Sequence, residues 1–374
     1  MGLSALLPPN SENKKGWPWD QETIFDLDDS KEHWPRISIV TPSYNQGIFL
    51  EETLRSILLQ NYHDLELIVI DGGSKDNSVE IIKKYEPWIS YWISEKDNGQ
   101  SDAINKGFKK ATGEIVAWIN SDDLLTPGSL HKVAEYFTDL PETTGLIHGG
   151  VLLFNEKRQI EERFTYLIPS RESYLSGMVF SQPSAFFKKA WLDRAGYLDN
   201  NLHYGMDNDL FMRLALLCDF YPVKDVFAKY RLHDQSKTIL ESNKFIGDWK
   251  RSFVCLCKNL SWNKELDFLK NTGLYGDELG YVNNFSFQIN EQIVMSVNRQ
   301  KALYFHLGHV LKDLYWTYHV DEAKKLLKLM LENFPEDWLK EDIRLEAVIV
   351  KLKFPGFVIK SIRRIKRMFR KGIF

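Results

Sequence analysis

A strand-like run that ends in polar side chains gives the first indication of chemistry in this chain. Residues 115–120 read Ile-Val-Ala-Trp-Ile-Asn, and Ser121, Asp122 and Asp123 follow directly. In an open α/β sheet, side chains that follow a buried strand lie in the crevice at the carboxyl ends of the strands, where ligands bind. Carboxylates gathered there suit a divalent cation, which prefers oxygen ligands and often shares them with substrate phosphates. Asp123 or Ser129 could instead cap the helix that follows.

The elements that must position these side chains are expected to form an α/β sheet. Strand and helix patterns alternate at short intervals up to this run, which indicates parallel strands joined by right-handed crossovers. The pattern becomes mixed from about Gly145, and the glycine-rich turn of a dinucleotide-binding strand is absent, which counts against an NAD enzyme. Strands are expected at 37–41, 65–71, 89–94, 115–120, 146–154, 160–166 and 221–230, and a helix at 207–217.

Composition and patterning limit the class of protein and divide the chain. A net charge of −3 argues against a general nucleic-acid binder. Three cysteines without zinc-site spacing are expected in a reducing, cytosolic compartment. We find no signal-peptide pattern at the start and no apolar run of about 18 residues that would span a membrane. The expected parts are an N-terminal extension, an α/β domain, a helical accessory region and a basic tail, at 1–34, 35–236, 237–350 and 351–374.

The two ends of the chain differ from its middle. The extension is expected either to lie over the main domain through its tryptophans or to be a partly disordered leader. The tail alternates basic and apolar residues and has no acidic residue, which favours an amphipathic segment lying on an anionic bilayer. A surface helix with its apolar face on the protein is the alternative. The basic residues of the tail are Lys351, Lys353, Lys360, Arg363, Arg364, Lys366, Arg367, Arg370 and Lys371.

Motifs spread over residues 36–236 closely resemble those of the family two glycosyltransferases, the inverting group with the GT-A fold. Each motif is short, but their order along the chain is specific to the family. The resemblance implies a Rossmann-like mixed sheet flanked by helices, followed here by the helical region, in an enzyme of bacterial polysaccharide or cell-envelope synthesis. The motifs are VTPSYN at 40–45, IDGGSKD at 70–76, DNGQSDAINKG at 97–107, NSDD at 120–123, MDNDL at 206–210 and RLH at 231–233.

The resemblance implies a nucleotide-sugar donor, with UDP- and dTDP-sugars favoured. Thr41, Pro42 and Tyr44 would line the base pocket, although Tyr44 could instead pack in the core. Asp71 would accept a hydrogen bond from the base imide. The family usually has two acidic residues where this chain has Asp71 and Gly72, so one expected carboxylate is missing.

The loops around the fourth strand add further donor-binding candidates. Asp97 and Asp102 are expected to face the ribose, the diphosphate or the sugar, unless Asp102 simply caps its helix. Lys106 is a candidate phosphate partner, with an exposed lysine at a helix end as the alternative. Asn120 and Ser121 complete the donor contacts. Asn120 stands where the family commonly has an aspartate, and it can hydrogen-bond a ribose or a water.

A divalent cation, Mn²⁺ or Mg²⁺, is the expected cofactor, because the site offers oxygen ligands beside substrate phosphates. By resemblance, Asp122 occupies the position that binds the cation, and Asp123 would bind it as well or cap the next helix. His233 would complete the coordination, unless it is a surface histidine.

The resemblance also assigns the residues that act on the acceptor. Asp207, at the start of its helix, would be the general base that takes the proton from the attacking hydroxyl. Gln182 is expected in the acceptor or sugar pocket. Asp209 would bind the acceptor or brace the site.

The sequence therefore predicts an inverting, metal-dependent glycosyltransferase that uses a glycan or lipid-linked acceptor. It would be cytoplasmic and peripheral to the inner face of the membrane, without a nucleic-acid partner. A nucleotidyltransferase is an alternative, but it would require a basic glycine-rich loop after the first strand, and residues 42–47 do not form one. Gly72 and Asn120 also allow a degenerate family member that acts as a binding or scaffold subunit. Asp122, Asp207 and His233 nevertheless retain the groups that transfer needs.

Overall fold

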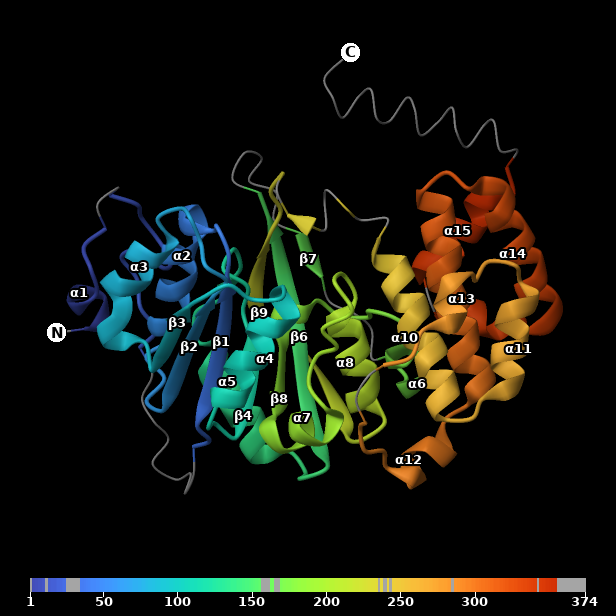
Figure 1. Ribbon diagram of the computed structural model, residues 1–374, viewed down its shortest axis with the longest axis horizontal. Helices are drawn as coiled ribbons and strands as arrows, with labels where there is room; N and C mark the ends of the chain where they lie inside the picture. The colour runs from blue at the N-terminus through green and yellow to red at the C-terminus, as the bar shows by residue number, and fades with distance from the viewer. Residues whose placement is uncertain are drawn as a thin grey trace, which may run out of the picture. The chain divides into compact units, whose positions relative to one another are not determined.

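Figure 1 shows a computed structural model of the chain, which forms two compact units. We call them the sheet unit (residues 1–169, 178–240 and 283–295) and the helical unit (residues 170–177, 241–282 and 296–374). Among the described residues, every helix is too short or too polar to cross a bilayer. The structure describes residues 2–10, 13–24, 34–155, 162–164, 169–234, 236–237, 241, 244–283, 286–341 and 343–354.

A nine-stranded mixed sheet is the centre of the sheet unit, in the order β3-β2-β1-β4-β8-β6-β9-β5 with β7 paired to β6. The first four strands of this order are parallel, as the sequence predicts. β8 is antiparallel to β4 and to β6, and β9 is parallel to β6. The strands are β1 (Ile37–Ser43), β2 (Leu65–Asp71), β3 (Tyr91–Ser94), β4 (Ile115–Trp118), β5 (Leu124–Leu125), β6 (Thr144–Phe154), β7 (Glu162–Phe164), β8 (Ala185–Lys188) and β9 (Asp219–Arg231).

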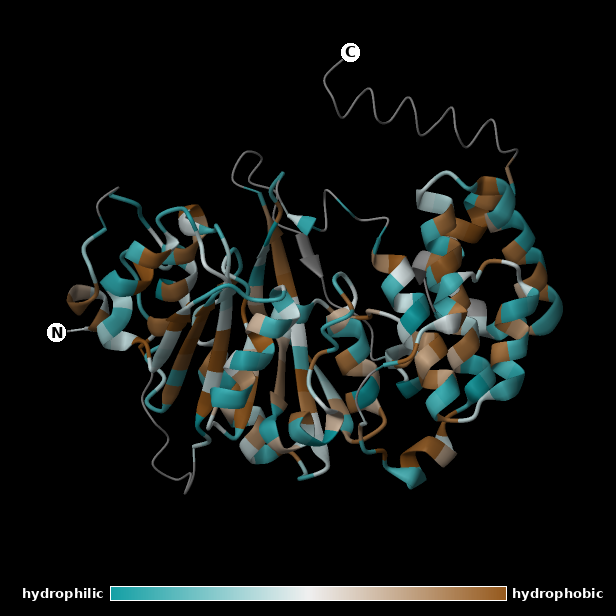
Figure 2. Cartoon of the chain, in the orientation of Figure 1, coloured by the Kyte–Doolittle hydropathy of each residue, from teal (hydrophilic) through white to brown (hydrophobic). Residues whose placement is uncertain are grey.

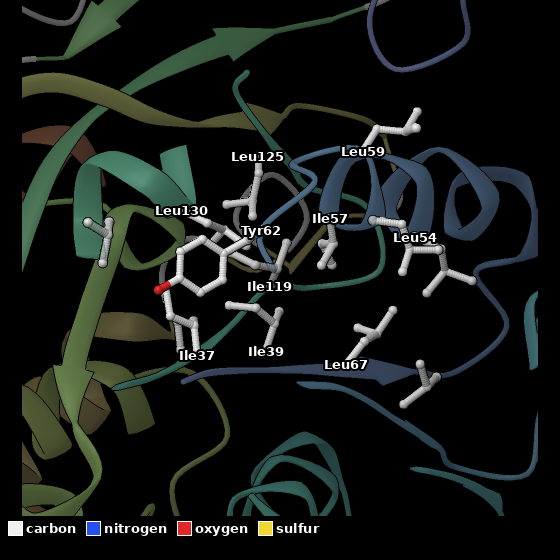
Figure 3. Close-up of a cluster of buried hydrophobic side chains, with 14 of the residues drawn as sticks. Ile37, Ile39, Leu54, Ile57, Leu59, Tyr62, Leu67, Ile119, Leu125 and Leu130 are labelled. Carbon is white, nitrogen blue, oxygen red and sulfur yellow. The ribbon is translucent and has the colours of Figure 1, made fainter. Parts of the chain in front are cut away.

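Helices cover both faces of this sheet, because alternate residues of its buried strands point to opposite sides. On one face, Ile37 and Ile39 of β1 pack with Leu54 and Ile57 of α2, as Figure 3 shows. Burying one such side chain stabilises the fold by roughly 1.5–3 kcal/mol. The helices of this unit are α1 (Leu3–Leu6), α2 (Gly47–Leu58), α3 (Ser78–Tyr85), α4 (Gln100–Lys110), α5 (Ser129–Asp139), α7 (Lys189–Ala195), α8 (Met206–Ala215) and α12 (Glu291–Ser296), with short 3-10 turns at Glu86–Trp88 and Gln182–Ser184.

On the other face, α4 and α8 pack on the sheet through aromatic rings. Trp118 of β4 stacks on Phe211 of α8 with ring centroids 5.9 Å apart, and Phe108 of α4 meets Trp118 edge-on at 5.9 Å. A Cβ on Gly107 would lie 2.3 Å from a methyl group of Val40 in β1. The glycine therefore lets α4 approach β1 closely. Figure 2 shows the resulting pattern, with apolar strands between helices whose outer faces are polar.

The described part of the N-terminal extension packs on the sheet unit. Three of its backbone carbonyls accept hydrogen bonds at 2.9–3.0 Å from the buried guanidinium of Arg55 in α2. They belong to Pro8, Pro18 and Trp19. The Trp17 indole donates to the backbone of β5 at 2.8 Å. This is the arrangement that the tryptophans of the extension led us to expect.

The helical unit is built around a hairpin of α13 and α14. Within it, His306 is fully buried, with Nδ1 2.9 Å from the carbonyl oxygen of Ser176 and Nε2 2.8 Å from the hydroxyl of Tyr275. Burial lowers the pKa of His306 to about 3. Residues 355–374, most of the predicted basic tail, lie outside the described residues. The helices are α6 (Arg171–Tyr174), α10 (Phe245–Asn259), α11 (Asn263–Asn271), α13 (Arg299–Trp316), α14 (Val320–Asn333) and α15 (Ile343–Leu352), with 3-10 turns at Asp277–Gly280 and Glu336–Glu341.

Candidate donor and catalytic site

The register of the parallel strands places the predicted site residues at one edge of the sheet. Ser43 at the end of β1 is paired with Asp71 at the end of β2, and Asp71 is paired with Ser94 at the end of β3. β4 ends at Trp118, so that its polar extension leaves the sheet at the same edge. Ligands of open α/β sheets bind at this edge.

Asp122 and His233 meet at this edge although 111 residues separate them in the sequence. His233 Nε2 lies 2.9 Å from Asp122 Oδ2, and the two side chains keep 13% and 20% of their surface exposed. His233 is therefore paired and mostly buried, and it is not a free surface histidine. One carboxylate and one imidazole can both reach a small cation placed between them, which fits a site that is completed by phosphate oxygens and water. Among the described residues, no third carboxylate, histidine or cysteine joins them to form a cluster that could hold a metal by itself.

The backbone beneath Asp122 is held by Arg231, whose side chain is buried. Its Nε donates to the Asp122 carbonyl at 2.8 Å, and its Nη2 forms an ion pair with Glu52 of α2 at 2.7 Å. The guanidinium also lies over the rings of Phe49 and Phe154, at 4.7 and 4.4 Å from their centroids. Arg231, which is buried, thus holds the backbone of Asp122 from within the fold.

Thr53 of α2 supports the same turn from the other side. Its hydroxyl lies 2.9 Å from the carbonyl oxygen of Ser121 and 2.8 Å from that of Asp123. Two successive residues of α2, Glu52 and Thr53, therefore hold the turn that carries the candidate metal ligand.

The Asp123 carboxylate is used within the fold. It accepts a hydrogen bond from the backbone N–H of Arg231 at 3.0 Å and another from the Asn120 amide at 3.3 Å. Burial, followed by the neighbouring charge of Asp122, raises the pKa of Asp123 well above its usual range. The expected capping of the next helix is wrong for Asp123 and for Ser129 alike. That helix, α5, begins after Gly128 without a side-chain cap, and the Ser129 hydroxyl bonds the carbonyls of Thr126 and Phe227.

Asn120 is the centre of an amide network. Its Oδ1 accepts from the side chain of Gln100 at 2.9 Å, and its Nδ2 lies 3.4 Å from Oε1 of Gln182. Gln182 is buried and donates to the carbonyl of Trp118 at 2.8 Å. The Lys237 ammonium donates to Gln100 at 3.1 Å, so a positive charge lies at the edge of this network.

At the expected base pocket, Thr41 and Pro42 are buried at the end of β1, whereas Tyr44 is 61% exposed. Tyr44 is therefore not a core residue, which leaves its ring accessible for packing on a base. The buried hydroxyls of Thr41 and Ser43 have no hydrogen-bond partner among the described residues.

Asp102 and Lys106, the other charged candidates of α4, pair with each other at 3.4 Å. Asp102 Oδ2 also accepts the backbone N–H of Asn98, in the loop before α4, at 3.0 Å, whereas α4 itself begins after Gly99 without a side-chain cap. Lys106 forms a second ion pair with Glu95 at 3.0 Å, and hydrogen bonding to Glu95 raises the pKa of the lysine.

Asp207 lies in the first turn of α8, half-buried, and accepts a hydrogen bond from the backbone N–H of Asn208 at 2.7 Å. Asp209 is buried instead, in an ion pair of 2.7 Å with Arg213. Arg213 in turn donates to the carbonyl of Tyr197 at 2.6 Å. The two carboxylates are therefore in different environments: Asp207 is accessible to a substrate, whereas Asp209 links α8 to the loop that precedes it.

Comparison with known proteins identifies the domain. Residues 38–196 match the family described as glycosyl transferase family 2. This matched part of the chain is a glycosyltransferase domain of family 2. The chain is 24% identical to an uncharacterized glycosyltransferase of Rickettsia typhi over 302 residues, which are 76% of this chain and 91% of that protein. It is 25% identical over 256 residues to a Campylobacter jejuni glucosyltransferase, covering 64% of this chain and 80% of the relative.

A solved structure is similar in fold. The first 349 residues of TarS from S. aureus, in complex with UDP-GlcNAc, superpose with a TM-score of 0.50 at 16% identity. The match covers 90% of this chain and 92% of that one. The glycosyltransferase therefore has the mixed α/β fold of the GT-A type that its motifs imply.

Sequence reasoning missed three residues that shape the site of this glycosyltransferase: Arg231, Glu52 and Thr53. Arg231, the last residue of β9, stands two positions before His233 in the same motif. This spacing was a usable signal for Arg231. Nothing in the pattern of α2 distinguishes Glu52 and Thr53 from ordinary helix residues, because their partners are backbone and side-chain groups of distant segments.

Proposed function

We propose that this glycosyltransferase moves a sugar from a nucleoside-diphosphate sugar to an acceptor hydroxyl with inversion at the anomeric carbon. The observation that carries the proposal is the approach of Asp122 and His233 to 2.9 Å at the carboxyl edge of the sheet. Asp207, half-buried in the first turn of α8, is the candidate base, and the exposed ring of Tyr44 is the candidate contact of the donor base. A degenerate scaffold protein would have no need to keep Asp122 and His233 together.

Asp122 and His233 would hold a divalent cation, Mn²⁺ or Mg²⁺, whereas the Asp123 carboxylate is engaged with Arg231 and Asn120. A bound cation of this kind stabilises the negative charge of a departing diphosphate by several kcal/mol. Arg231 keeps the Asp122 backbone in place, which limits the reorganisation that donor binding requires.

Asp207 would accept the proton of the acceptor hydroxyl as its oxygen attacks the sugar from the face opposite the diphosphate. Inversion in one displacement needs this one carboxylate and no covalent intermediate. General-base assistance of this kind contributes about 10²–10⁴-fold to the rate. The position of Asp207 at the start of α8 also places its negative charge where the helix dipole stabilises it.

A lipid-linked glycan is the acceptor that we favour. The C. jejuni relative is named a GalNAc(5)-diNAcBac-PP-undecaprenol β-1,3-glucosyltransferase, so that its name gives a lipid-linked glycan as its acceptor. We extend this acceptor class to the present chain, with a free polysaccharide as the alternative. UDP- and dTDP-sugars are the donors that we favour.

A peripheral contact with the inner face of the membrane would bring the enzyme to such an acceptor. The basic residues of 351–374 supply the charge. The described residues next to this segment are suited to the same surface. Trp316 and Phe354 are 57% and 53% exposed, and the Lys351 ammonium lies 5.8 Å from the Trp316 ring centroid. Tryptophan rings flanked by basic residues are typical of the headgroup region of bilayers.

Calorimetric binding of UDP, dTDP and GDP, each with and without Mn²⁺, tests the proposal on the purified full chain. We expect one nucleotide to bind tightly and only with the cation. Absence of binding for all three in a folded sample would contradict the proposed transfer and favour a scaffold role.

A further inference from the structure

The carboxylate expected to read the donor base, Asp71, is already saturated by its own chain. Its Oδ2 accepts hydrogen bonds from the backbone N–H groups of Gly73 and Ser74 at 3.1 and 2.9 Å and from the Ser94 hydroxyl at 2.6 Å. Its Oδ1 accepts from the Ser74 hydroxyl at 2.5 Å, and the side chain has no exposed surface. Asp71 therefore shapes the loop after β2 and is not accessible to a base.

The next position, Gly72, is where the family resemblance leads us to expect the second acid. Successive residues of an extended chain point to opposite sides, so that a side chain at 72 would leave the backbone away from Asp71. A Cβ built on Gly72 would lie 2.5 Å from Oδ2 of Asp97, closer than a real Cβ atom comes to another heavy atom outside its own residue. The space for a residue at 72 is filled by the carboxylate of Asp97.

The distance itself is informative. In an aspartate, standard bond lengths place each carboxylate oxygen about 2.4 Å from its own Cβ. Asp97 Oδ2 thus stands about as far from the position of a Cβ at 72 as the oxygen of an aspartate at 72 would stand. Oδ2 of Asp97 therefore takes the place of the carboxylate oxygen that an acidic residue at 72 would supply, although Asp97 lies in a different loop.

Asp97 is positioned for this role by its own loop. Its Oδ1 accepts the backbone N–H of Gly99 at 2.9 Å, which fixes the direction of the carboxylate. No described residue donates a hydrogen bond to its Oδ2, and the side chain is only half-buried. Gly72 donates its own N–H to the carbonyl of Ser43 at 2.8 Å, so that Oδ2 of Asp97, next to Gly72, lies near the end of β1 and the expected base pocket.

We propose that Asp97 is the residue that determines base specificity in this enzyme, by accepting the ring N–H of a uracil or thymine base through Oδ2. Gly72 is required because any side chain there would displace that carboxylate. This inference rests on the proposed nucleotide-sugar donor and names the residue that reads its base. It assigns Asp71 a structural role. It also assigns Asp97 to the base of the donor, where the sequence led us to expect a contact with the ribose, the diphosphate or the sugar.

Binding of UDP and of N3-methyl-UDP, in the presence of Mn²⁺, tests the assignment on the full chain, because the methyl group removes the ring N–H. We expect the wild type to prefer UDP at least tenfold, as hydrogen bonds to charged groups are worth about that much or more. Asp97→Ala should abolish this preference. A mere disturbance of the loop would weaken both nucleotides alike and leave the preference intact, which would overturn the proposal.

A second set of variants tests the exchange between the two positions. Gly72→Asp should weaken UDP binding at least tenfold, because two carboxylates would compete for one space. Combining it with Asp97→Gly should restore both the binding and the preference for UDP over its methylated form. If the combined variant bound UDP no more tightly than Gly72→Asp alone, the idea that Asp97 replaces an acid at position 72 would be overturned. Glu80→Gln, an exposed carboxylate of α3, is the control and should behave as wild type.

The outcomes separate this inference from the function on which it rests. A wild type that binds neither UDP nor dTDP nor GDP contradicts the proposed function. A wild type that binds UDP or dTDP without discriminating against methylation at N3 leaves the function in place and overturns the role of Asp97. A wild type that binds GDP but neither UDP nor dTDP would likewise overturn the role of Asp97 and leave the proposed function in place.

Discussion

His233 Nε2 and Asp122 Oδ2 are 2.9 Å apart, and Arg231, two residues before the histidine, holds the backbone carbonyl of the same aspartate at 2.8 Å. The end of β9 thus contacts Asp122 twice, through one side chain at its carboxylate and another at its peptide group. A carboxylate fixed in this way can bind a cation with little loss of conformational freedom, because its position is set before the ligand arrives.

Removing the Asp122 carboxylate should separate the cation-dependent part of donor binding from the rest. We expect Asp122→Ala to lower donor affinity in Mn²⁺ by about tenfold or more, while the weak affinity in a chelator stays unchanged. Calorimetry of the preferred nucleotide under both conditions gives the comparison. Asp267→Ala, an exposed carboxylate of the helical unit, should leave both affinities unchanged. If Asp122→Ala kept its response to Mn²⁺, the assignment of this residue to the cation would be wrong.

Asp207→Asn should lower the turnover number by about 10²–10⁴-fold and leave donor affinity nearly intact, because the base acts mainly in the transition state. Single-turnover transfer and equilibrium binding of the donor measure the two effects separately. Asp193→Asn, whose carboxylate is exposed at 45%, serves as the control. Near wild-type turnover in Asp207→Asn would require another base.

Arg231→Met should destabilise the sheet unit by about 3–5 kcal/mol, since it leaves Glu52 without its partner in a mostly buried ion pair. Lys84→Met removes the corresponding ion pair of the neighbouring residue, Glu51, where the lysine is 37% exposed. We expect that variant to change stability by less than about 1 kcal/mol. Denaturant unfolding measures the free energy of unfolding of both variants. Equal losses would mean that the buried ion pair of Arg231 stabilises the fold no more than the exposed ion pair of Lys84.

Deleting residues 355–374 should reduce binding to vesicles that contain anionic lipid, because each lysine or arginine near such a surface contributes about 1 kcal/mol. This deletion keeps α15, which ends at Leu352, and is therefore cleaner than one that begins at Lys351. Co-sedimentation with anionic and with zwitterionic vesicles measures the effect. Changing the basic residues of this segment to glutamine keeps its length and removes its charge, and it should reduce vesicle binding as the deletion does. Unchanged binding to anionic vesicles in either variant would contradict the proposed membrane contact.

The free energy of unfolding should fall as the pH decreases from neutrality, because His306 stays neutral in the folded protein. Its pKa is lowered to about 3 by burial, while an unfolded histidine titrates near 6.5. Below the unfolded value only the unfolded chain binds the proton, so stability is full above it and is lost progressively down to the folded value. This amounts to about 1 kcal/mol between pH ~7 and ~5.5.

His306→Gln should make that pH dependence weaker by the same amount, whatever it does to stability at neutral pH. Two other buried histidines, His131 and His148, with pKa values lowered by burial to about 4 and about 3, keep the remaining dependence. Unfolding curves at the two pH values, with wild type and variant side by side, measure the difference. An unchanged dependence in the variant would show that His306 does not titrate as burial requires.

Much of the sheet was predictable because buried strands are visible as apolar runs. The run 65–71 was expected as a strand and is β2 with the same bounds, and the expected strand at 115–120 corresponds to β4, which ends two residues earlier. The approach of Asp122 to His233 followed from the family motifs alone. No local pattern would have placed together two residues that lie 111 positions apart.

The failures have a common physical cause. Asp123 and Ser129 have the right chemistry for caps, but long-range partners in β9 use their oxygens instead. Asp71 likewise looked accessible at a strand end, whereas Ser74 and Ser94 saturate it. Which polar group meets which partner depends on the tertiary fold, and a local propensity contains no information about it.

The guanidinium of Arg55 has one more consequence, for how the enzyme can be shortened. Three of its acceptors are carbonyls of the N-terminal extension, while the arginine itself lies in α2 beneath the sheet. A fragment trimmed to the first residue of the family match would leave a buried cation without those oxygens. Such a fragment should be poorly soluble although every donor-site and catalytic residue is retained. We therefore expect the smallest stably folded piece of this protein to include Pro8, well outside the region that sequence comparison alone would mark for expression.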